Sequence, residues 1–420
     1  MRRALRALLG VVVACTATLA VPQYGRAGPT LVFDVRTGEI LHSYSPFTPW
    51  HPASLTKLMT AYVTFQAVRQ GKVSLSSPVR ISSAALAQPP SKMGFPVGTE
   101  ITVEYALRIL MVKSANDIAH ALAEAVSGSH DGFIADMNAA ARRLGMRDTT
   151  YANPHGLHDA RQVTTARDTA VLTRALIREF PQHQRFFEIS RIQVGQRVLS
   201  NHNKLIGRFR GADGMKTGYI CASGFNIVAT ATRGGRRLAA VVFGGMSGAK
   251  RNEVTALLLE AAFEAGGGFG RIGVGRPNID RLQRPASIGK PVDMRPYVCQ
   301  KRKAPAHLAS FGIEEGAVLA TTGATSGDPS RTVNSAAGGG FLNNGFSALS
   351  LVRGAKPKLE GVAAPADPLV AFDVPLPRPK PAVRGVTRPQ TEATPSSVQR
   401  KPEPASMLSL PRPNPRREYR

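Results

Sequence analysis

The chain has 420 residues, enough for two or three domains, and 43% of them are hydrophobic, enough for a sizeable buried core. Its formal net charge of +26 suits an anionic partner such as nucleic acid, a membrane surface or an acidic polymer. Neither a C-x-x-C pair nor an H-E-x-x-H motif occurs, so a zinc site is unsupported and we expect no metal and no cofactor.

The N-terminus predicts export. An arginine-rich start precedes an apolar run over residues 8–20 that is too short to span a bilayer easily. We expect a signal peptide over residues 1–27 and a periplasmic or other extracytoplasmic location. Residues 12–15 also resemble a bacterial lipoprotein box, but we favour ordinary cleavage because the apolar run continues past Cys15. Export makes nucleic acid an unsuitable target and leaves anionic wall polymer or lipid.

Periodicity then predicts the elements in chain order. A β-hairpin is expected over residues 30–44, turning at 36–39. A helix buried on most sides should begin near Pro52. Further helices are predicted over residues 103–113, 118–126, 133–144, 165–180 and 251–264. Strands are predicted over residues 193–198, 211–220, 225–232 and 237–243, with a hairpin turn at 233–236.

The helix that begins near Pro52 carries the first chemical candidates, Ser54 and Lys57. Three residues apart on a helix, both side chains lie on one face, one turn apart. A serine hydroxyl is a poor nucleophile until a neighbouring base takes its proton. A lysine can act as that base when burial or a second cation lowers its pKa. The pair therefore suggests an activated serine.

This S-x-x-K spacing alone proves little, because it recurs at Ser247 and at Ser287. Only the Ser54 match precedes both an S-x-N triplet, residues 114–116, and a K-T-G triplet, residues 216–218. The S-x-N triplet lies at the junction between two predicted helices. At such a junction its side chains could project into a cleft. An ordinary helix N-cap explains the same residues and remains open.

The composition changes after residue 270, where 20 of the 31 prolines lie. We predict a basic, Pro-rich and mostly disordered tail over residues 271–420. Its charge could attract anionic wall polymer or a membrane surface. Cys221 and Cys299 could pair in an oxidising compartment. Because Cys299 lies beyond the compact region, we expect two unpaired thiols.

Residues 28–270 resemble the serine-type D-alanyl-D-alanine carboxypeptidases, the low-molecular-mass penicillin-binding proteins. The resemblance rests on residues 51–57, 114–117, 153–157 and 213–218, in family order. It implies an α+β fold of the β-lactamase and penicillin-binding transpeptidase type. A five-stranded antiparallel sheet would carry K-T-G on an edge strand and helices on both faces. It also implies β-lactam inhibitors and removal of the terminal D-alanine from peptidoglycan stem pentapeptides.

The resemblance also implies roles for individual residues. Ser54 would attack the carbonyl of the penultimate D-alanine and Lys57 would take its proton. Ser114 would relay a proton to the leaving amine, and Asn116 would contact the substrate amide. The other implied groups are the charge of Lys216, the hydroxyl of Thr217 on the terminal carboxylate, the close approach allowed by Gly218, the oxyanion-hole N–H groups of Ser54 and Tyr219, and Arg251 as a carboxylate contact. Arg251 matters because His202 stands where many relatives carry an arginine.

Three rival functions remain. A class A β-lactamase needs a loop glutamate for deacylation, and none lies between Thr149 and Arg178. A DD-endopeptidase that cuts peptidoglycan crosslinks shares all three motifs. A catalytically inactive wall-binding protein would not need the motifs intact.

Overall fold

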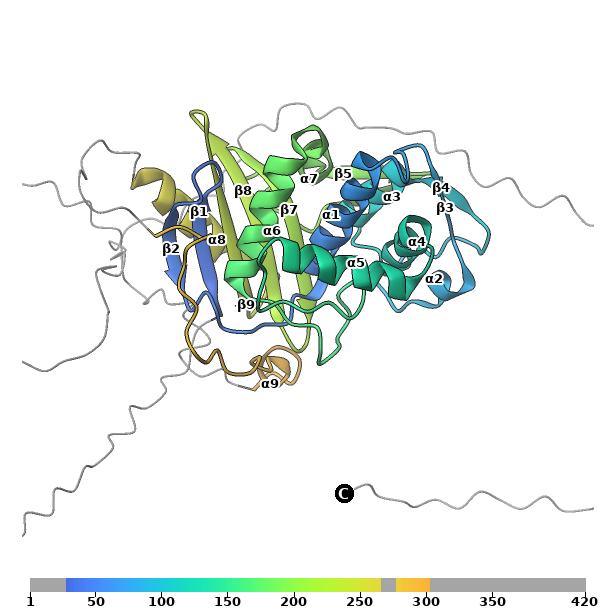
Figure 1. The fold of residues 1–420 in the computed structure, drawn as a ribbon. Helices are drawn as coiled ribbons and strands as arrows, with labels where there is room; N and C mark the ends of the chain where they lie inside the picture. The colour runs from blue at the N-terminus through green and yellow to red at the C-terminus, as the bar shows by residue number, and fades with distance from the viewer. Residues whose placement is uncertain (1–27, 266–276, 303–420) are drawn as a thin grey trace, which may run out of the picture. The chain divides into compact units, whose positions relative to one another are not determined.

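The computed structural model describes residues 28–265 and 277–302 (Figure 1). The expected signal peptide and the tail from residue 303 onward lie outside the described residues. No helix in the described ranges is both long enough and apolar enough to cross a bilayer.

A five-stranded antiparallel sheet forms the centre of the fold, in the order β2-β1-β9-β8-β7. Its strands are β1 (Thr30–Asp34), β2 (Ile40–Tyr44), β7 (Ala212–Ile220), β8 (Gly224–Arg233) and β9 (Arg236–Gly245). The β8–β9 turn is made by Gly234 and Gly235 at φ +53° and +75°, as a tight hairpin requires. The strand that contains K-T-G, β7, lies at one edge, as the sequence resemblance predicts.

Helices cover both faces of this sheet, because alternate residues of its central strands are apolar on each side (Figure 1). α6 (Ala166–Glu179) packs on β9 and β1, and α8 (Gly248–Glu264) packs on the opposite face. Leu31 and Phe33 of β1 face the larger core, while Val32 between them faces the α8 side. The α+β prediction is confirmed.

A helical region lies beside the β7 edge and supplies the other wall of the site. Its long helices are α1 (Thr56–Arg69), α3 (Val103–Val112), α4 (Asn116–Ser127) and α5 (His130–Arg143). The short elements are the 3-10 turns η1 (Ala53–Leu55) and η2 (Pro181–His183), the helices α2 (Ser83–Ala87) and α7 (Arg185–Glu188), and the ribbon strands β3 (Pro78–Arg80) and β4 (Glu100–Thr102). Most residues of α1 are themselves buried, as predicted.

The single strand predicted over residues 193–198 is wrong. The chain instead forms a hairpin of β5 (Arg191–Val194) and β6 (Arg197–Ser200). Gly195 at φ +57° turns the chain between them. The alternating pattern was read correctly as extended backbone, but the reversal within it was missed.

Residues 277–302, which we call the strap, pack against the catalytic unit beyond the boundary expected at residue 270. Ile279 donates its N–H to the carbonyl of Gly38 at 3.0 Å, and Met294 donates to Ala222 at 3.1 Å. Both side chains are fully buried. The strap contains the short helix α9 (Arg295–Val298) and then Cys299, which forms a disulfide with Cys221. The expectation of two unpaired thiols is therefore wrong, because the strap folds back on the end of β7.

Candidate active site

A cleft of about 730 Å³ opens between the edge strand β7 and the helical region. It is lined by residues from every predicted motif: Ser54, Ser114, Asn116, Thr217, Gly218, Tyr219 and Arg251. Lys57 and Lys216 lie directly behind this lining, 0% and 1% exposed. The structure thus brings together all nine residues that the sequence singles out.

Ser54 lies in η1, the turn that leads into α1. Two close approaches fix this turn. A Cβ added to Gly156 would lie 1.9 Å from the carbonyl oxygen of Ala53, and one added to Gly218 would lie 3.0 Å from the Ser54 nitrogen. Only glycine permits such contacts without displacement. The K-T-G strand and the 153–157 loop therefore hold the Ser54 backbone between them.

Lys57 Nζ has three polar neighbours, and a neutral amine can satisfy all of them. It lies 2.6 Å from the carbonyl oxygen of His155, 2.8 Å from Asn116 Oδ1 and 3.1 Å from Ser54 Oγ. Two of these atoms accept only, because a carbonyl and an amide oxygen carry no proton. A neutral amine has two N–H donors for them and one lone pair left for the serine hydroxyl. The geometry fits a neutral lysine that accepts the proton of Ser54.

The electrostatics agree with this geometry. Burial first, and the Lys216 cation second, lower the pKa of Lys57 well below its usual value. Asp117 opposes the shift. The pKa of Lys216 falls to about 7, through burial and then through Arg251. Each cation thus favours the neutral form of its neighbour: Lys216 lowers the pKa of Lys57, and Arg251 lowers the pKa of Lys216.

The S-x-N triplet joins α3 to α4, and the side chains of its serine and asparagine do not cap the start of α4. The cap position of α4 is Ala115, which makes no side-chain cap bond. Ser114 Oγ accepts a bond from Lys216 Nζ at 2.9 Å, and Asn116 Nδ2 donates to the carbonyl of Pro89 at 2.9 Å. The ordinary N-cap explanation is therefore wrong for Ser114 and Asn116.

On the opposite wall, the K-T-G strand places a cation and a hydroxyl beside the cleft. Lys216 Nζ reaches both Ser114 Oγ and its neighbour's carbonyl, Thr217 O, each at 2.9 Å. This contact spans the cleft and ties β7 to the α3–α4 junction. Thr217 and Gly218 line the cleft, and the Tyr219 side chain is 44% exposed.

Arg251, near the start of α8, lines the same cleft and is 5% exposed. Its guanidinium donates to Asn252 Oδ1 at 2.8 Å and to the carbonyl of Asn226 at 3.4 Å, and burial lowers its pKa to about 10. His202 also lines the cleft, and burial followed by Lys216 lowers its pKa to about 4. At neutral pH, His202 is uncharged and Arg251 carries the charge suited to a carboxylate.

The other S-x-x-K matches have structural explanations. Ser247 caps α8 by accepting the N–H of Lys250 at 3.1 Å. Ser287 and Lys290 are both exposed, on the strap. Neither pair shares the cleft.

Sequence reasoning missed three supporting groups. The backbone carbonyl of His155 accepts a hydrogen bond from Lys57 Nζ at 2.6 Å and so fixes the amine. Asp117 accepts the N–H groups of Met93 and Gly94, at 2.9 and 2.8 Å, and so holds the loop above the cleft. Asn226 Nδ2 donates to the carbonyl of His51 at 3.0 Å, steadying the chain before Ser54. The Asn153–Leu157 signature was the only signal for the first of these.

Comparison with known proteins identifies the family to which the chain belongs. The family model of the peptidase S11 D-alanyl-D-alanine carboxypeptidases matches residues 16–247. The chain belongs to this family. Family membership accounts for the order of the motifs, and the match ends before α8 and the strap.

Individual members of the family cover the same region. D-alanyl-D-alanine carboxypeptidase DacA of Haemophilus influenzae is 35% identical over 219 residues, which are 51% of this chain and 56% of that protein. The match thus spans about half the length of this relative. Penicillin binding protein 5 from Haemophilus influenzae superimposes with a TM-score of 0.55 at 33% identity, covering 57% of this chain and 71% of that one. Penicillin-binding protein D2 of Listeria monocytogenes, solved in an ampicillin-bound form, gives a TM-score of 0.50 at 28% identity, covering 56% and 97%.

Proposed function

We propose that this protein is an exported serine-type D-alanyl-D-alanine carboxypeptidase that removes the terminal D-alanine from peptidoglycan stem pentapeptides. The observation that carries the proposal is the arrangement of Lys57. In its neutral form this amine can donate its two N–H groups to the carbonyl oxygen of His155 and to Asn116 Oδ1, which leaves its lone pair for the Ser54 hydroxyl 3.1 Å away. Such an amine can take the hydroxyl proton as the serine attacks.

The acylation step uses both walls of the cleft. Ser54 Oγ attacks the carbonyl carbon of the penultimate D-alanine, and Lys57 takes the proton. The negative charge that develops on the carbonyl oxygen is stabilised by the backbone N–H groups of Ser54 and Tyr219. Gly218 lets β7 approach the Ser54 backbone closely, because it has no side chain at this point. The N–H groups of Ser54 and Tyr219 can therefore point at the same carbonyl oxygen.

Departure of the terminal D-alanine needs a proton on its nitrogen. Ser114 relays it: the hydroxyl proton passes to the nitrogen and is replaced by a proton from the Lys216 ammonium, which donates to Ser114 Oγ at 2.9 Å. Lys216, Thr217 and Arg251 attract the terminal carboxylate. Water then hydrolyses the ester on Ser54 by the reverse proton path. Asn116, whose Oδ1 orients Lys57, contacts the substrate amide from the helical side.

β-Lactams mimic a scissile amide beside a carboxylate, and the same residues would bind them and be acylated. β-Lactamase activity has less support than carboxypeptidase activity. No glutamate lies between Thr149 and Arg178, and the buried carboxylate there, Asp168, accepts from Thr149 Oγ1 at 2.8 Å and pairs with Arg167 at 3.0 Å. Asp168 is therefore occupied by contacts within the fold.

The DD-endopeptidase alternative rests on the extent of the cleft, which continues past Arg251 to Lys204, Arg208 and Glu253. A crosslinked leaving group is larger than D-alanine and would need such room. Digestion of purified muropeptides separates the two activities. We expect loss of one D-alanine from monomeric pentapeptides to be the faster reaction. Faster splitting of crosslinked dimers would assign the endopeptidase function instead, and no reaction with either substrate or with penicillin would leave the inactive wall-binding protein.

The basic tail forms a separate proposal. Residues 271–420 contain 23 Lys plus Arg and 11 Asp plus Glu, and those after Arg302 contain 15 Lys plus Arg and 9 Asp plus Glu, a surplus of 6 positive charges. We expect residues after Arg302 to hold the enzyme near anionic wall polymer or lipid headgroups, an attraction that salt screens. Truncation after Arg302 keeps every candidate site residue and the disulfide.

This truncated enzyme should release D-alanine from a soluble peptide within about three-fold of the full chain, because its site is intact. It should be retained less on isolated cell envelopes at low salt, and about 0.5 M salt should remove the difference. Equal retention of both proteins at low salt would contradict the proposal and identify the tail as a spacer.

A further inference from the structure

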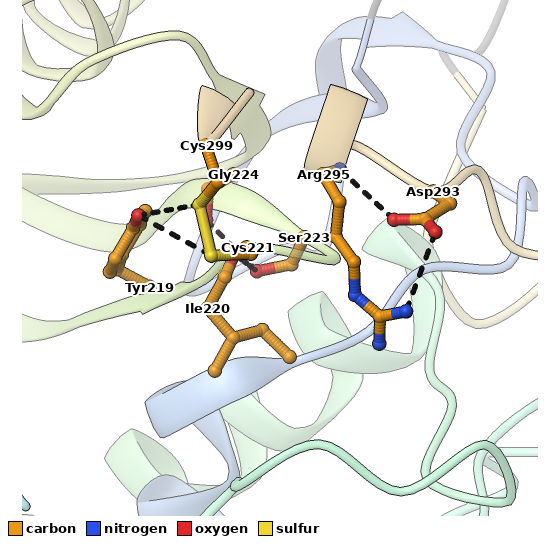
Figure 2. The surroundings of a disulfide bond; sticks show 8 residues. All are labelled: Tyr219, Ile220, Cys221, Ser223, Gly224, Asp293, Arg295 and Cys299. Atoms are coloured by element: carbon orange, nitrogen blue, oxygen red, sulfur yellow. Dashed lines mark hydrogen bonds and ion pairs between the residues drawn. A yellow bond between two sulfur atoms is a disulfide. The ribbon is translucent and has the colours of Figure 1, made fainter. Parts of the chain in front are cut away.

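The strap reaches the cleft at the C-terminal end of β7. Figure 2 shows the Cys221–Cys299 disulfide beside Tyr219, with Asp293 and Arg295 on the same segment. Tyr219 Oη lies 3.3 Å from Cys299 Sγ and 3.9 Å from Cys221 Sγ. Tyr219 and Ile220 line the cleft, and Cys221 follows them directly in the chain, so the disulfide lies next to the cleft lining.

The Tyr219 side chain is held from two sides although 44% of it is exposed. Its ring stacks on Phe225, with centroids 4.2 Å apart, and its hydroxyl touches the disulfide. The strap is anchored at the same place by the Met294 N–H bond to Ala222 and by the burial of the Met294 side chain. The orientation of this cleft residue therefore depends on the strap as well as on the sheet.

Substrate direction tells which part of the peptide meets the strap. Under the proposed function, the terminal carboxylate lies near Lys216 and Thr217, and the reacting carbonyl lies near the Tyr219 N–H. A peptide that follows β7 onward leads past Ile220 toward Cys221. The residues before D-alanyl-D-alanine therefore leave the reaction centre toward the disulfide and α9.

Charge on the strap suits that part of the substrate. Arg295, Lys301 and Arg302 are exposed, and Asp293 pairs with Arg295 at 3.7 Å. Burial first, and then the Arg295 cation, lower the pKa of His158 while Asp293 raises it, so both members of this ion pair lie within electrostatic reach of the loop that carries Leu157. Stem peptides carry free carboxylates before the terminal dipeptide, and a basic wall attracts them.

We propose that the strap wall, residues 293–302 secured by the Cys221–Cys299 disulfide, binds the carboxylate-bearing part of the stem peptide and makes the enzyme prefer long anionic substrates to short ones. The inference rests on the proposed carboxypeptidase function and adds a substrate-recognition surface to it. The family model ends at residue 247, so this wall is built from a segment outside the matched region.

The test compares two substrates that share the same terminal dipeptide. One is a free stem pentapeptide, and the other is diacetyl-lysyl-D-alanyl-D-alanine, which has no carboxylate before the dipeptide. Arg295→Glu reverses one charge on the wall, and Arg281→Glu is the matched control on an exposed strap residue before the wall. We expect Arg295→Glu to raise KM for the pentapeptide roughly three- to ten-fold with kcat nearly unchanged, and the effect to fade at about 0.5 M salt.

The KM for the short substrate should change by less than about two-fold in both variants, because charges at the rim of a site act mainly on the encounter with charged ligands. A second arm reduces the disulfide of the wild type with dithiothreitol, which passes two electrons and two protons to the sulfurs and becomes a cyclic disulfide. Reduction should raise KM for the pentapeptide selectively, and a Cys221→Ser/Cys299→Ser variant should not respond to the reductant. Penicillin acylation reports that the folded site survives each treatment.

Equal changes for both substrates in every arm, or no change in any, would overturn the substrate-recognition role of the wall. Loss of reaction with both substrates in the untreated wild type would instead overturn the carboxypeptidase function, and this inference with it. The two failures are therefore distinguishable.

Discussion

Replacing Ser54 by alanine should abolish both covalent labelling by fluorescent penicillin and release of D-alanine from a pentapeptide. Both reactions require an ester on Ser54 Oγ, and alanine has no atom that can form it. We expect a loss of at least about a thousand-fold, as in other serine enzymes that lose their nucleophile. The protein should remain folded, because Ser54 is only partly buried and its backbone, not its side chain, is fixed by Gly156 and Gly218.

Ser287→Ala is the matched control, since Ser287 belongs to a second S-x-x-K match but is exposed on the strap. It should label like the wild type. Circular dichroism and thermal melting check that the Ser54→Ala protein is folded. Penicillin labelling that persists in this variant, with the label mapped by mass spectrometry to another serine, would remove Ser54 from the mechanism.

The elements that the sequence predicts correctly are those whose signal is local. The β8–β9 hairpin is marked by two glycines between apolar strands, and α1 by an unbroken buried pattern after Pro52. Such signals depend on neighbours within a few residues. The position of β7 at the sheet edge came from family resemblance, because strand order depends on contacts that periodicity does not record.

The packing of the strap could not be predicted from local sequence patterns. Only Ile279 and Met294 of this segment are fully buried, so it has too few apolar residues to signal a fold by itself. Its stability comes from partners far away in the chain, such as Gly38 and Ala222, and from the disulfide. A Pro-containing polar segment with such distant partners has the composition of a tail, and we predicted one.

In the site, the sequence identified the reacting side chains and missed the backbone group that positions Lys57. All nine candidate residues meet at one cleft. The backbone carbonyl of His155 cannot be chosen from sequence, because every residue has a carbonyl and only the fold aims this one at Lys57. The sequence analysis expected burial or a second cation to lower the pKa of Lys57, and the structure shows both, with burial the larger cause and Lys216 the second.

Replacing Lys57 should lower acylation nearly as severely as replacing the nucleophile. Lys57→Ala removes the base, and we expect the rate of penicillin acylation to fall roughly 10²- to 10⁴-fold, the usual contribution of a general base. The variant also leaves the carbonyl of His155 and the amide oxygen of Asn116 without their shared donor. Lys57→Gln, which keeps an amide N–H donor but has no basic lone pair, should be equally inactive while folding better.

The pH dependence separates a base from a structural lysine. In the wild type, acylation should rise as pH increases through the lowered pKa of Lys57, because only the neutral amine can accept the Ser54 proton. This rising limb should be absent from the residual activity of Lys57→Gln. Lys290→Gln, at the exposed second lysine of an S-x-x-K match, should keep both the rate and the limb.

A folded Lys57→Gln protein that acylates at a near-normal rate would show that another group deprotonates Ser54. A slow variant that kept the rising limb unchanged would assign that limb to a different group and leave Lys57 with a positioning role only. The expected result, loss of rate together with loss of the limb, is the one that a merely structural lysine cannot produce, because burial and hydrogen bonding alone give no reason for the activity to follow the protonation of this amine.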